Sequence, residues 1–437
     1  MPTPVWEIRP GADTPRLLHV NATATGGGVA ELLRGLVEEQ RGEGINAGWA
    51  VIGGTAEFYA ITKYLHHLLH GRAVPNRIAD PATLRTYREV LVPQAAWFRS
   101  SLGIGDVVVL HDPQTLGLAP ALRATGARVV WHCHVGAEVP PERGPAAVWQ
   151  AMAPELAAID AVVTTLPAFA PPTVPAGNRF VIPPAIDPSA PKNRALTEAE
   201  ISSLLDGIGL TAPSGRRGRA DIVQEGVLPA EARVVLQVSR WDPLKGIPDV
   251  VRAVECLPPD VHLVVAGADP REIPDDPEGA AVLAEVLDVL AGLAPEDRAR
   301  VHLISIAQQP AEVSALLVNA LQRRADVVVQ KSVAEGFGLT VTEAMIKGRA
   351  VLATEVGGIR LQITDGRDGL LVDATDHQAF AAALLRLLAD PELRVRLGES
   401  ARQRVLDHYT LRRLVADYRG VTGLADAAGD LLDGATA

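Results

Sequence analysis

The sequence predicts an α/β protein built on two doubly wound parallel sheets, and three observations support this. Short apolar runs alternate with helical patterns along most of the 437 residues, which is the pattern of repeated βαβ units. The apolar runs are continuous rather than alternating, as expected of strands that helices cover on both faces. The alternation occurs twice, on either side of a proline-rich stretch at 182–191.

The predicted strands fall into two sets of apolar runs. The first set is 16–20, 48–53, 107–110, 128–135, 161–165 and 179–183. The second set is 234–239, 262–267, 301–305, 326–330, 350–354 and 369–373. Helical segments lie between them, and the segment 281–293 places on one face Val282, Val286, Leu287, Leu290 and Leu293.

The proline-rich stretch marks the domain boundary. We expect an N-terminal domain over residues 1–185, a C-terminal domain over 186–407, and a helix within 408–437 that returns to the first domain. From the boundary to about residue 230 we expect an irregular chain. Its three arginines in 211–221 fit either an anion site or a solvated surface loop, and we favour the loop. Two domains facing each other across a cleft place strand ends around a shared ligand.

Composition excludes several classes of protein. A hydrophobic fraction of 48% and the lack of a repeat exclude a disordered or fibrous chain. The net charge of -11 repels nucleic acid and anionic lipid, so any phosphate contact must be local. Two cysteines cannot form a disulfide framework, and we find neither a signal peptide nor an apolar run long enough to cross a bilayer. We expect a soluble, cytoplasmic protein.

A triple glycine lies between a predicted strand and a predicted helix. Gly26, Gly27 and Gly28 let backbone amides approach an anion, with a positive helix N-terminus behind them. A flexible turn needs the same residues, so this alternative stays open. The spacing differs from G-x-G-x-x-G and no acidic ribose ligand follows at the expected distance, which argues against nicotinamide binding.

Two cations bracket a turn between another strand end and a helix. Arg240 and Lys245 can both reach one diphosphate, as a fork and a point charge respectively. A surface arginine and lysine on a turn is the alternative. In a chain with net charge -11, their position at the carboxyl end of a strand favours the anion site.

The segment 326–360 carries two carboxylates, Glu335 in a loop after a strand and Glu343 in the first turn of a helix. The glycines between them let the chain fold back so that both carboxylates face the cleft, where one can bind a ribose diol. The pattern Thr340-x-x-Glu343 also fits a capping box, which would make Glu343 purely structural. The ligand site that we expect from this segment comprises Glu335, Gly336, Phe337, Gly338, Leu339, Thr340 and Glu343.

This constellation resembles the retaining GT-B glycosyltransferases, whose C-terminal domain carries an E-x7-E motif and a diphosphate-binding Arg and Lys. More specific stretches resemble the trehalose glycosyltransferring synthases within that class. These stretches are HVNATATGGGVAELL, EFYAITKYLHHLLHG, HDPQ, IPPAIDPSAPKN, DDPEG and NALQRRADVVVQKSVAEGFGLTVTEAM. The resemblance covers most of residues 16–410 and weakens at about 210–230.

The resemblance implies a GT-B fold of two Rossmann-like domains and a retaining hexosyltransferase. The donor is a nucleoside-diphosphate glucose (UDP, ADP or GDP), the acceptor is a sugar, and glucose as acceptor gives trehalose. No cofactor or metal is implied, and relatives of this type make a homodimer plausible. Arg240, Lys245 and the amides at 339 and 340 would hold the phosphates. Glu335 would bind the transferred sugar, Glu343 the ribose, and the three glycines would cover the phosphates.

Histidines mark the other candidate positions. His66 and His70 have the i, i+4 spacing of a metal pair, but without a third ligand we favour a non-metal role. His132 suits a packed core. By resemblance, His134 contacts the transferred sugar near its reacting carbon. We assign to the acceptor wall His111, Asp112, Lys63 and Gly136.

Gly136 departs from the family pattern, which has an acidic residue after the cleft histidine. Its glycine removes a carboxylate that could hold a sugar hydroxyl, so the acceptor can differ from glucose. Three rival functions remain open: the same transfer to an amino sugar, cyclitol or secondary metabolite, a phosphorylase on the same fold, and a non-catalytic sugar-nucleotide-binding protein.

Overall fold

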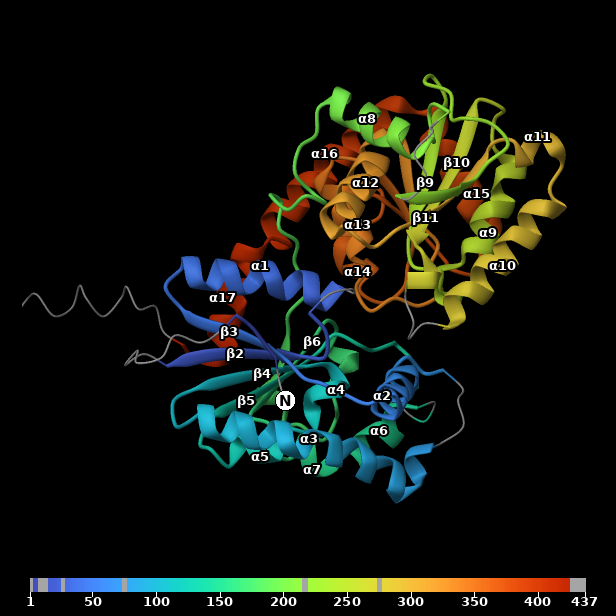
Figure 1. Ribbon diagram of the computed structural model, residues 1–437. Helices are drawn as coiled ribbons and strands as arrows, with labels where there is room; N and C mark the ends of the chain where they lie inside the picture. Colours follow the sequence, from blue (N-terminus) through green and yellow to red (C-terminus); the bar gives the residue numbers. More distant parts are fainter. Residues whose placement is uncertain are drawn as a thin grey trace, which may run out of the picture. The chain divides into compact units, whose positions relative to one another are not determined.

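The computed structural model describes residues 3–6, 15–24, 28–72, 77–140, 142, 144–213, 219–272 and 277–424. The chain forms two compact units (Figure 1). Unit 1 comprises residues 1–185 together with 411–437, and unit 2 comprises residues 186–410. Gly26 and Gly27 lie outside the described residues, as do two of the three loop arginines, Arg216 and Arg217.

Unit 1 contains a seven-stranded sheet within its described residues, in the order β1-β3-β2-β4-β5-β6-β7. Its strands are β1 (Thr3–Trp6), β2 (Arg16–Asn21), β3 (Asn46–Val51), β4 (Val107–His111), β5 (Arg128–Cys133), β6 (Ala161–Thr164) and β7 (Arg179–Val181). Its helices are α1 (Gly28–Gly42), α2 (Ala56–Leu69), α3 (Pro81–Ser101), α4 (Asp112–Leu116), α5 (Ala119–Arg123), α6 (Pro145–Ala151), α7 (Ala153–Leu156) and α17 (Leu411–Thr422), with 3-10 turns η1 (Arg77–Ala79), η3 (Pro167–Phe169) and η4 (Ala176–Asn178).

Strand residues of unit 1 alternate between two cores. Leu18, Val108 and Val129 pack with α2 and α3, whereas Val109 and Val130 pack with α1 and α17 on the other face. Figure 1 shows α1 and α17 together on one face of this sheet and α3, α5 and α7 on the other. The strands are therefore buried on both faces, which explains their continuous apolar runs.

Unit 2 contains a second seven-stranded sheet, in the order β14-β13-β12-β9-β10-β11-β8. Its strands are β8 (Ala220–Val223), β9 (Arg233–Val238), β10 (Val261–Ala268), β11 (Val301–Ile306), β12 (Val327–Gln330), β13 (Ala350–Thr354) and β14 (Leu370–Val372). Its helices are α8 (Glu198–Ile208), α9 (Ile247–Arg252), α10 (Pro277–Gly292), α11 (Pro295–Arg298), α12 (Ala311–Arg324), α13 (Leu339–Ile346), α14 (Ile359–Gln362), α15 (His377–Ala389) and α16 (Pro391–His408), with 3-10 turns η5 (Pro243–Lys245), η6 (Ala253–Cys256) and η7 (Pro270–Glu272).

Two edge strands were not predicted from the sequence. β1 and β8 each have four residues and pair antiparallel with β3 and β11 respectively, whereas the other pairings in both sheets are parallel. β8 alternates between half-buried and exposed residues, so it lacks the continuous apolar run of a central strand.

The prediction of an irregular chain up to residue 230 is wrong, since this region contains α8 as well as β8. A capping box begins α8, in which the Thr197 side chain accepts from the Glu200 amide and the Glu200 carboxylate accepts from the Thr197 amide. Gly209 ends the helix in the left-handed conformation, with φ of 87°. In α10 the predicted apolar face is buried except for Leu287, which is 36% exposed.

Candidate functional site

Each sheet has a point where the chain reverses its direction of travel through the strand order. In unit 2, the chain runs from β9 to β10 on one side, and β12 leads to β13 on the other. In unit 1, the corresponding neighbours are β2 and β4. Ligands of open α/β sheets bind at the carboxyl ends of strands beside such a point. The predicted site residues of unit 2 follow these strands. In unit 1, His111 and Asp112 lie at the end of β4, whereas His134 and Gly136 follow the next strand, β5.

In unit 2, an ion pair links the segments that follow β9 and β12. Lys245 Nζ lies 2.5 Å from Glu335 Oε2, and both side chains are largely shielded from solvent, at 12% and 13% exposure. Ser332 Oγ also donates to Glu335 Oε2, at 3.2 Å. The two residues were predicted from separate motifs 90 positions apart, and the fold brings them together.

Backbone contacts hold the two segments in place. The Gln237 side chain donates to the Lys245 carbonyl at 2.9 Å and accepts from the Lys331 amide at 3.2 Å. Gly246 adopts φ of 59°, and a Cβ there would lie 2.2 Å from the Lys331 carbonyl oxygen. Glycine is therefore required at this close approach. These contacts fix the backbone of the two segments that carry Lys245 and Glu335.

Arg240 lies on the same segment but is more open to solvent. Its side chain is 55% exposed, and Nη2 lies 2.8 Å from Asp242 Oδ2. Asp242 also accepts from the Leu244 amide at 2.8 Å and so caps the turn η5. Asp242 therefore orients the Arg240 guanidinium, and the hydrogen bond from the Leu244 amide holds Asp242 in place.

The glycine loop after Glu335 packs against a second glycine pair. A Cβ on Gly357 would lie 1.7 Å from the Glu335 carbonyl oxygen, and a Cβ on Gly358 would lie 2.5 Å from the Gly336 carbonyl oxygen. Gly338 adopts φ of 89° and precedes α13 as its N-cap without a side-chain cap. The first amides of α13, at Leu339 and onward, begin beside Glu335, whose Cγ would be 3.2 Å from a Cβ on Gly338.

The structure corrects the expected position of Glu343 and shows how Phe337 is placed. Phe337 is buried in the core of unit 2, so only its backbone can face a ligand. Glu343 is the fifth residue of α13, and the first turn of this helix contains no acidic residue. Thr340 does not cap the helix, since its hydroxyl donates to Gln330 Oε1 at 3.1 Å. The capping-box interpretation of Glu343 is therefore wrong.

Glu343 instead lies in a buried polar cluster. Its Oε1 is 3.5 Å from Lys192 Nζ. Lys347, one turn later, donates to the Glu343 carbonyl and to Gln322 Oε1, both at 2.8 Å. Burial lowers the pKa of Lys347 to about 7, against the opposing effect of the Glu343 charge.

In unit 1, three strands carry histidines on one face of the sheet at the switch point. His19 on β2, His111 on β4 and His132 on β5 each follow, two positions later, a core residue beneath α1 and α17, so they share that face of the sheet. His111 and His132 are direct neighbours in the parallel register. His134 follows two positions later, just beyond the end of β5.

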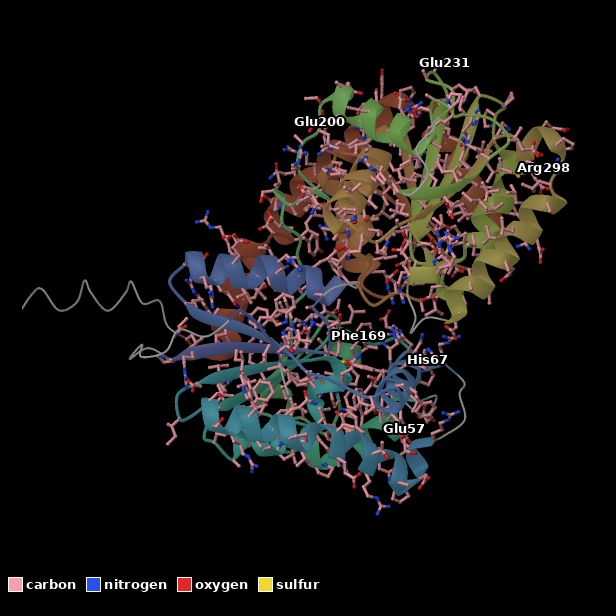
Figure 2. All side chains as sticks on the ribbon, in the orientation of Figure 1. Glu57, His67, Phe169, Glu200, Glu231 and Arg298 are labelled. Carbon is pink, nitrogen blue, oxygen red and sulfur yellow. The ribbon has the colours of Figure 1, made fainter. Side chains whose placement is uncertain are left out.

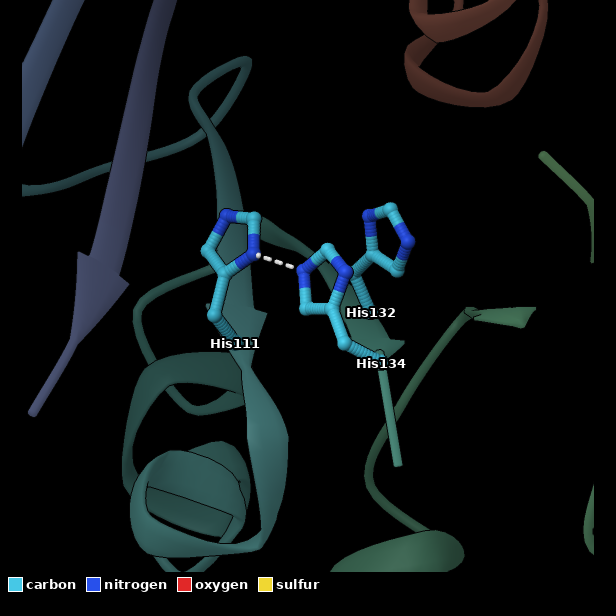
Figure 3. Close-up of side chains that lie close together, drawn as sticks. All are labelled: His111, His132 and His134. Carbon is cyan, nitrogen blue, oxygen red and sulfur yellow. Dashed lines mark hydrogen bonds between the residues drawn. The ribbon is translucent and has the colours of Figure 1, made fainter. Parts of the chain in front are cut away.

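These rings form a hydrogen-bonded array. His111 Nδ1 lies 2.9 Å from His134 Nε2, the contact drawn in Figure 3, and His111 Nε2 lies 2.9 Å from His19 Nδ1. His19 Nε2 continues to Gln40 Oε1 on α1, at 3.1 Å. His132 Nδ1 forms a separate short hydrogen bond with the hydroxyl of Tyr418 on α17.

Burial keeps these imidazoles neutral. It lowers the pKa of His19 to about 4 and that of His134 to about 3. The pKa values of His111 and His132 are lowered well below the ordinary value by burial and by the neighbouring histidines. A neutral ring has one donor and one acceptor nitrogen. Each hydrogen bond of the array therefore determines which nitrogen of the next ring carries the hydrogen, and no ring carries a charge.

Asp112 connects the ends of β4 and β5. It adopts φ of 62°, and its Oδ1 accepts from the backbone amide of His134 at 2.8 Å. Its carbonyl accepts from the Trp131 indole at 3.1 Å. Burial raises the pKa of Asp112 to about 7, although the His134 amide favours the charged form. Asp112 therefore holds His134 in place in addition to its predicted position beside the acceptor.

The remaining acceptor-wall residues are more scattered. Gly136 is buried, and a Cβ there would lie 2.2 Å from Cγ of Phe169, which Figure 2 labels. An aromatic ring thus fills the space beside Gly136, where the resemblance led us to expect an acidic residue. Lys63 lies half-buried on α2.

Two histidine groups can be considered as metal sites. His111, His132 and His134 each offer a ring nitrogen within 4.8 Å of the others. However, His132 and His134 stack with centroids 3.8 Å apart at 24°, so their in-plane lone pairs run side by side instead of converging on one ion. On α2, the rings of His66 and His70 lie 4.6 Å apart, and among the described residues no third ligand joins them.

Sequence reasoning missed His19, Gln40 and Tyr418. His19 had a detectable signal, because it lies in a buried strand, near its carboxyl end, as His111 and His132 do. Gln40 and Tyr418 lie on helices 21 and 286 positions from their partners, and only the fold brings them to the histidines.

The geometry and the comparisons agree on the class of protein. Residues 218–404 match the family of group 1 glycosyl transferases, and residues 19–171 match the N-terminal domain of trehalose synthase. An α,α-trehalose-phosphate synthase (UDP-forming) from Burkholderia vietnamiensis superposes with a TM-score of 0.69 at 17% identity, covering 97% of this chain and 100% of that one. The protein is a GT-B glycosyltransferase and an enzyme of the hexosyltransferase type.

The particular family follows from the relatives. The chain is 36% identical over 412 residues to the trehalose synthase of Rubrobacter xylanophilus, covering 92% of this chain and 88% of that protein. It therefore belongs to the trehalose synthase family. It is also 26% identical over 416 residues to the trehalose phosphorylase of Pleurotus pulmonarius, where the match covers 89% of this chain and 54% of the longer protein. None of the described helices has the length and apolar character needed to span a membrane.

Proposed function

We propose that this protein is a retaining glucosyltransferase that moves glucose from a nucleoside-diphosphate glucose to free glucose and so forms trehalose. The observation that carries the proposal is the Lys245–Glu335 pair at the β9/β12 switch point, in a chain of the trehalose synthase family. The ammonium and the carboxylate are the two charges that a sugar diphosphate requires, one for phosphate and one for hydroxyl groups.

Unit 2 would bind the donor. Lys245 and Arg240 hold the diphosphate together with the amides at Leu339 and Thr340, and Glu335 accepts hydrogen bonds from hydroxyls of the transferred glucose. The bond between the anomeric carbon and the diphosphate oxygen breaks while the acceptor oxygen bonds to the same face of that carbon. The acceptor's proton passes to the departing phosphate oxygen. Fixed cations stabilise this leaving group where its charge develops.

Glu343 would bind the ribose of the nucleotide, with its charge balanced by Lys192. In unit 1, His134 would bind a hydroxyl of the transferred sugar. His111, Asp112 and Lys63 would form the acceptor wall.

Two variations of this function have a specific observation in their favour. Phe169 occupies the space beside Gly136, which favours a sugar acceptor other than glucose, such as an amino sugar or a cyclitol. The similarity to trehalose phosphorylase favours a reaction with free phosphate in place of the nucleotide.

An acceptor screen separates these possibilities. Purified enzyme is incubated with UDP-, ADP- or GDP-glucose and a panel of sugars, and nucleotide release and product mass are measured. We expect nucleotide diphosphate and trehalose with glucose as acceptor. Release with another sugar only supports the altered acceptor. Phosphate-dependent cleavage of trehalose without nucleotide identifies a phosphorylase and contradicts the proposal.

A further inference from the structure

A continuous chain of hydrogen bonds runs through unit 1 and ends at the histidine that we assign to the transferred sugar. It begins at Gln40 on α1 and passes through His19 and His111 to His134 (Figure 3 shows its last link). The three distances are 3.1, 2.9 and 2.9 Å. Gln40, His19 and His111 are buried, at 0%, 0% and 1% exposure.

The first link determines the direction of all the others. The Gln40 amide is oriented with Oε1 toward His19. This oxygen can only accept, so His19 Nε2 carries the hydrogen and His19 Nδ1 is left as an acceptor. His111 Nε2 must then donate to it, which leaves His111 Nδ1 as an acceptor for His134. His134 consequently carries its hydrogen on Nε2. Its Nδ1, which has no hydrogen-bond partner within the described chain, is an acceptor.

This direction of the hydrogen bonds holds only if all three rings are neutral, because an imidazolium donates from both nitrogens. Burial lowers the pKa of His19 to about 4, that of His134 to about 3, and that of His111 well below its ordinary value. Each ring therefore carries one N–H hydrogen, and the hydrogen bond to the amide oxygen of Gln40 determines on which of its two nitrogens that hydrogen lies.

We propose that Gln40 is a positioning residue that acts through His19 and His111 to fix His134 as the Nε2–H tautomer. The free Nδ1 then accepts a hydrogen bond, so the sugar group that it meets is a hydroxyl acting as donor. This assignment rests on the proposed role of His134 toward the transferred sugar. Gln40 itself touches no substrate.

The chain offers two ways to break the relay and one matched control. Gln40→Met removes the terminal acceptor while keeping a side chain of similar length, and His19→Phe removes a middle link. Tyr418→Phe removes a buried hydroxyl from the same face of the sheet, but that hydroxyl bonds to His132, outside the relay. Melting temperatures of all three variants show whether each protein remains folded.

The test reads the tautomer directly. Protein labelled with [15N]histidine is studied by long-range 1H–15N correlation without substrate, and the His134 signals are identified by their loss in His134→Gln. We expect wild type and Tyr418→Phe to show a protonated Nε2 and an unprotonated Nδ1 at His134. In Gln40→Met and His19→Phe we expect averaged signals from mixed tautomers. The kcat should fall by about 10-fold with an unchanged KM for the nucleotide sugar, since one directed hydrogen bond is lost.

A protonated Nδ1 at His134 in wild type, or a tautomer unchanged in both relay variants, would overturn the inference. These outcomes are distinguishable from failure of the proposed function. Because the spectra are recorded without substrate, an enzyme that transfers no glucose can still show the relay, and an active wild type can lack it.

Discussion

The two units carry different chemistry at the switch points of their sheets. Unit 2 places charged side chains there in ion pairs, whereas unit 1 places neutral histidines there in a hydrogen-bonded chain. The unit 2 pairs are Lys245–Glu335, Arg240–Asp242 and Lys192–Glu343. Unit 1 has Gln40, His19, His111 and His134.

This difference matches the two kinds of group that the proposed reaction handles. A departing diphosphate gains negative charge, so its site needs cations that are already fixed. Sugar hydroxyls stay neutral, so their site needs hydrogen bonds of defined direction instead. Substitutions of the unit 2 cations should therefore affect nucleotide binding and its salt dependence, and substitutions of the unit 1 histidines should affect turnover.

The largest effect is expected when the carboxylate of the central pair is removed. Glu335→Gln leaves Lys245 without its ionic partner and weakens the hydrogen bonds to the transferred sugar. We expect kcat to fall by about 10²–10³-fold. Nucleotide release under saturating donor measures it. Glu225→Gln breaks the exposed pair with Arg298 and should leave kcat unchanged. A loss of less than about threefold for Glu335→Gln would contradict its assignment.

The two cations should differ according to their burial. Lys245→Ala should weaken binding of the nucleoside diphosphate by about 100-fold and the exposed Arg240→Ala by about 10-fold, since each loses a charge-assisted hydrogen bond. Titration calorimetry at low and high salt measures both, and the wild-type affinity should fall as salt rises. Equal affinity in both variants and wild type would show that the diphosphate does not bind at Lys245 and Arg240. Arg298→Ala serves as the control.

The Glu343→Gln variant tests whether Glu343 binds the ribose or has a purely structural role. If it binds the ribose, Glu343→Gln should weaken nucleotide affinity by about 10-fold at an unchanged melting temperature. Calorimetry and thermal unfolding on the same sample decide the case. A lower melting temperature with unchanged affinity would show that Glu343 serves only the buried cluster with Lys192.

In unit 1, a stability measurement tests the burial of Asp112. The native pKa of about 7 lies above the ordinary value of 3.8, so the native state binds more protons than the unfolded state between these pH values. The stability contribution of Asp112 therefore decreases as pH rises through this window and is constant above it. Asp112→Asn still accepts the His134 amide but does not titrate. Denaturant unfolding should show the variant gaining stability relative to wild type from pH 4 to 7, and a pH-independent difference would refute the burial argument.

The smallest effect is expected from removal of metal ions. The histidine rings of unit 1 form hydrogen bonds with one another, and the cations of unit 2 supply the positive charge, so dialysis against a chelator should leave the transfer rate unchanged. Restoration of a lost rate by added Zn²⁺ or Mg²⁺ would instead indicate a metal site, with His111, His132 and His134 as the first candidates.

The central strands and the positions of Lys245 and Glu335 after two of them could be predicted from the sequence, because both have local signals. Buried parallel strands have continuous apolar runs, and Lys245 and Glu335 lie just beyond two of them. β1 and β8 were missed because short edge strands lack such runs. The predicted position of Glu343 in the helix was wrong. Thr340-x-x-Glu343 has the sequence pattern of a capping box, but the helix starts at Leu339, after the N-cap Gly338.

The histidine relay was beyond sequence reasoning for a different reason. His19 and His111 are 92 positions apart, and their contact depends on β2 and β4 being neighbours in the sheet. A strand pattern gives the face of each residue but does not give the order of the strands.

The most direct test of the account is the stereochemistry of transfer. Enzyme, UDP-glucose labelled with 13C at the anomeric carbon, and unlabelled glucose are followed by 13C NMR together with nucleotide release. We expect each diphosphate released to be matched by one α-linked labelled glucose in trehalose, and we expect Glu335→Gln to suppress both signals together. A β-linked product, or trehalose formed without nucleotide release, would contradict it.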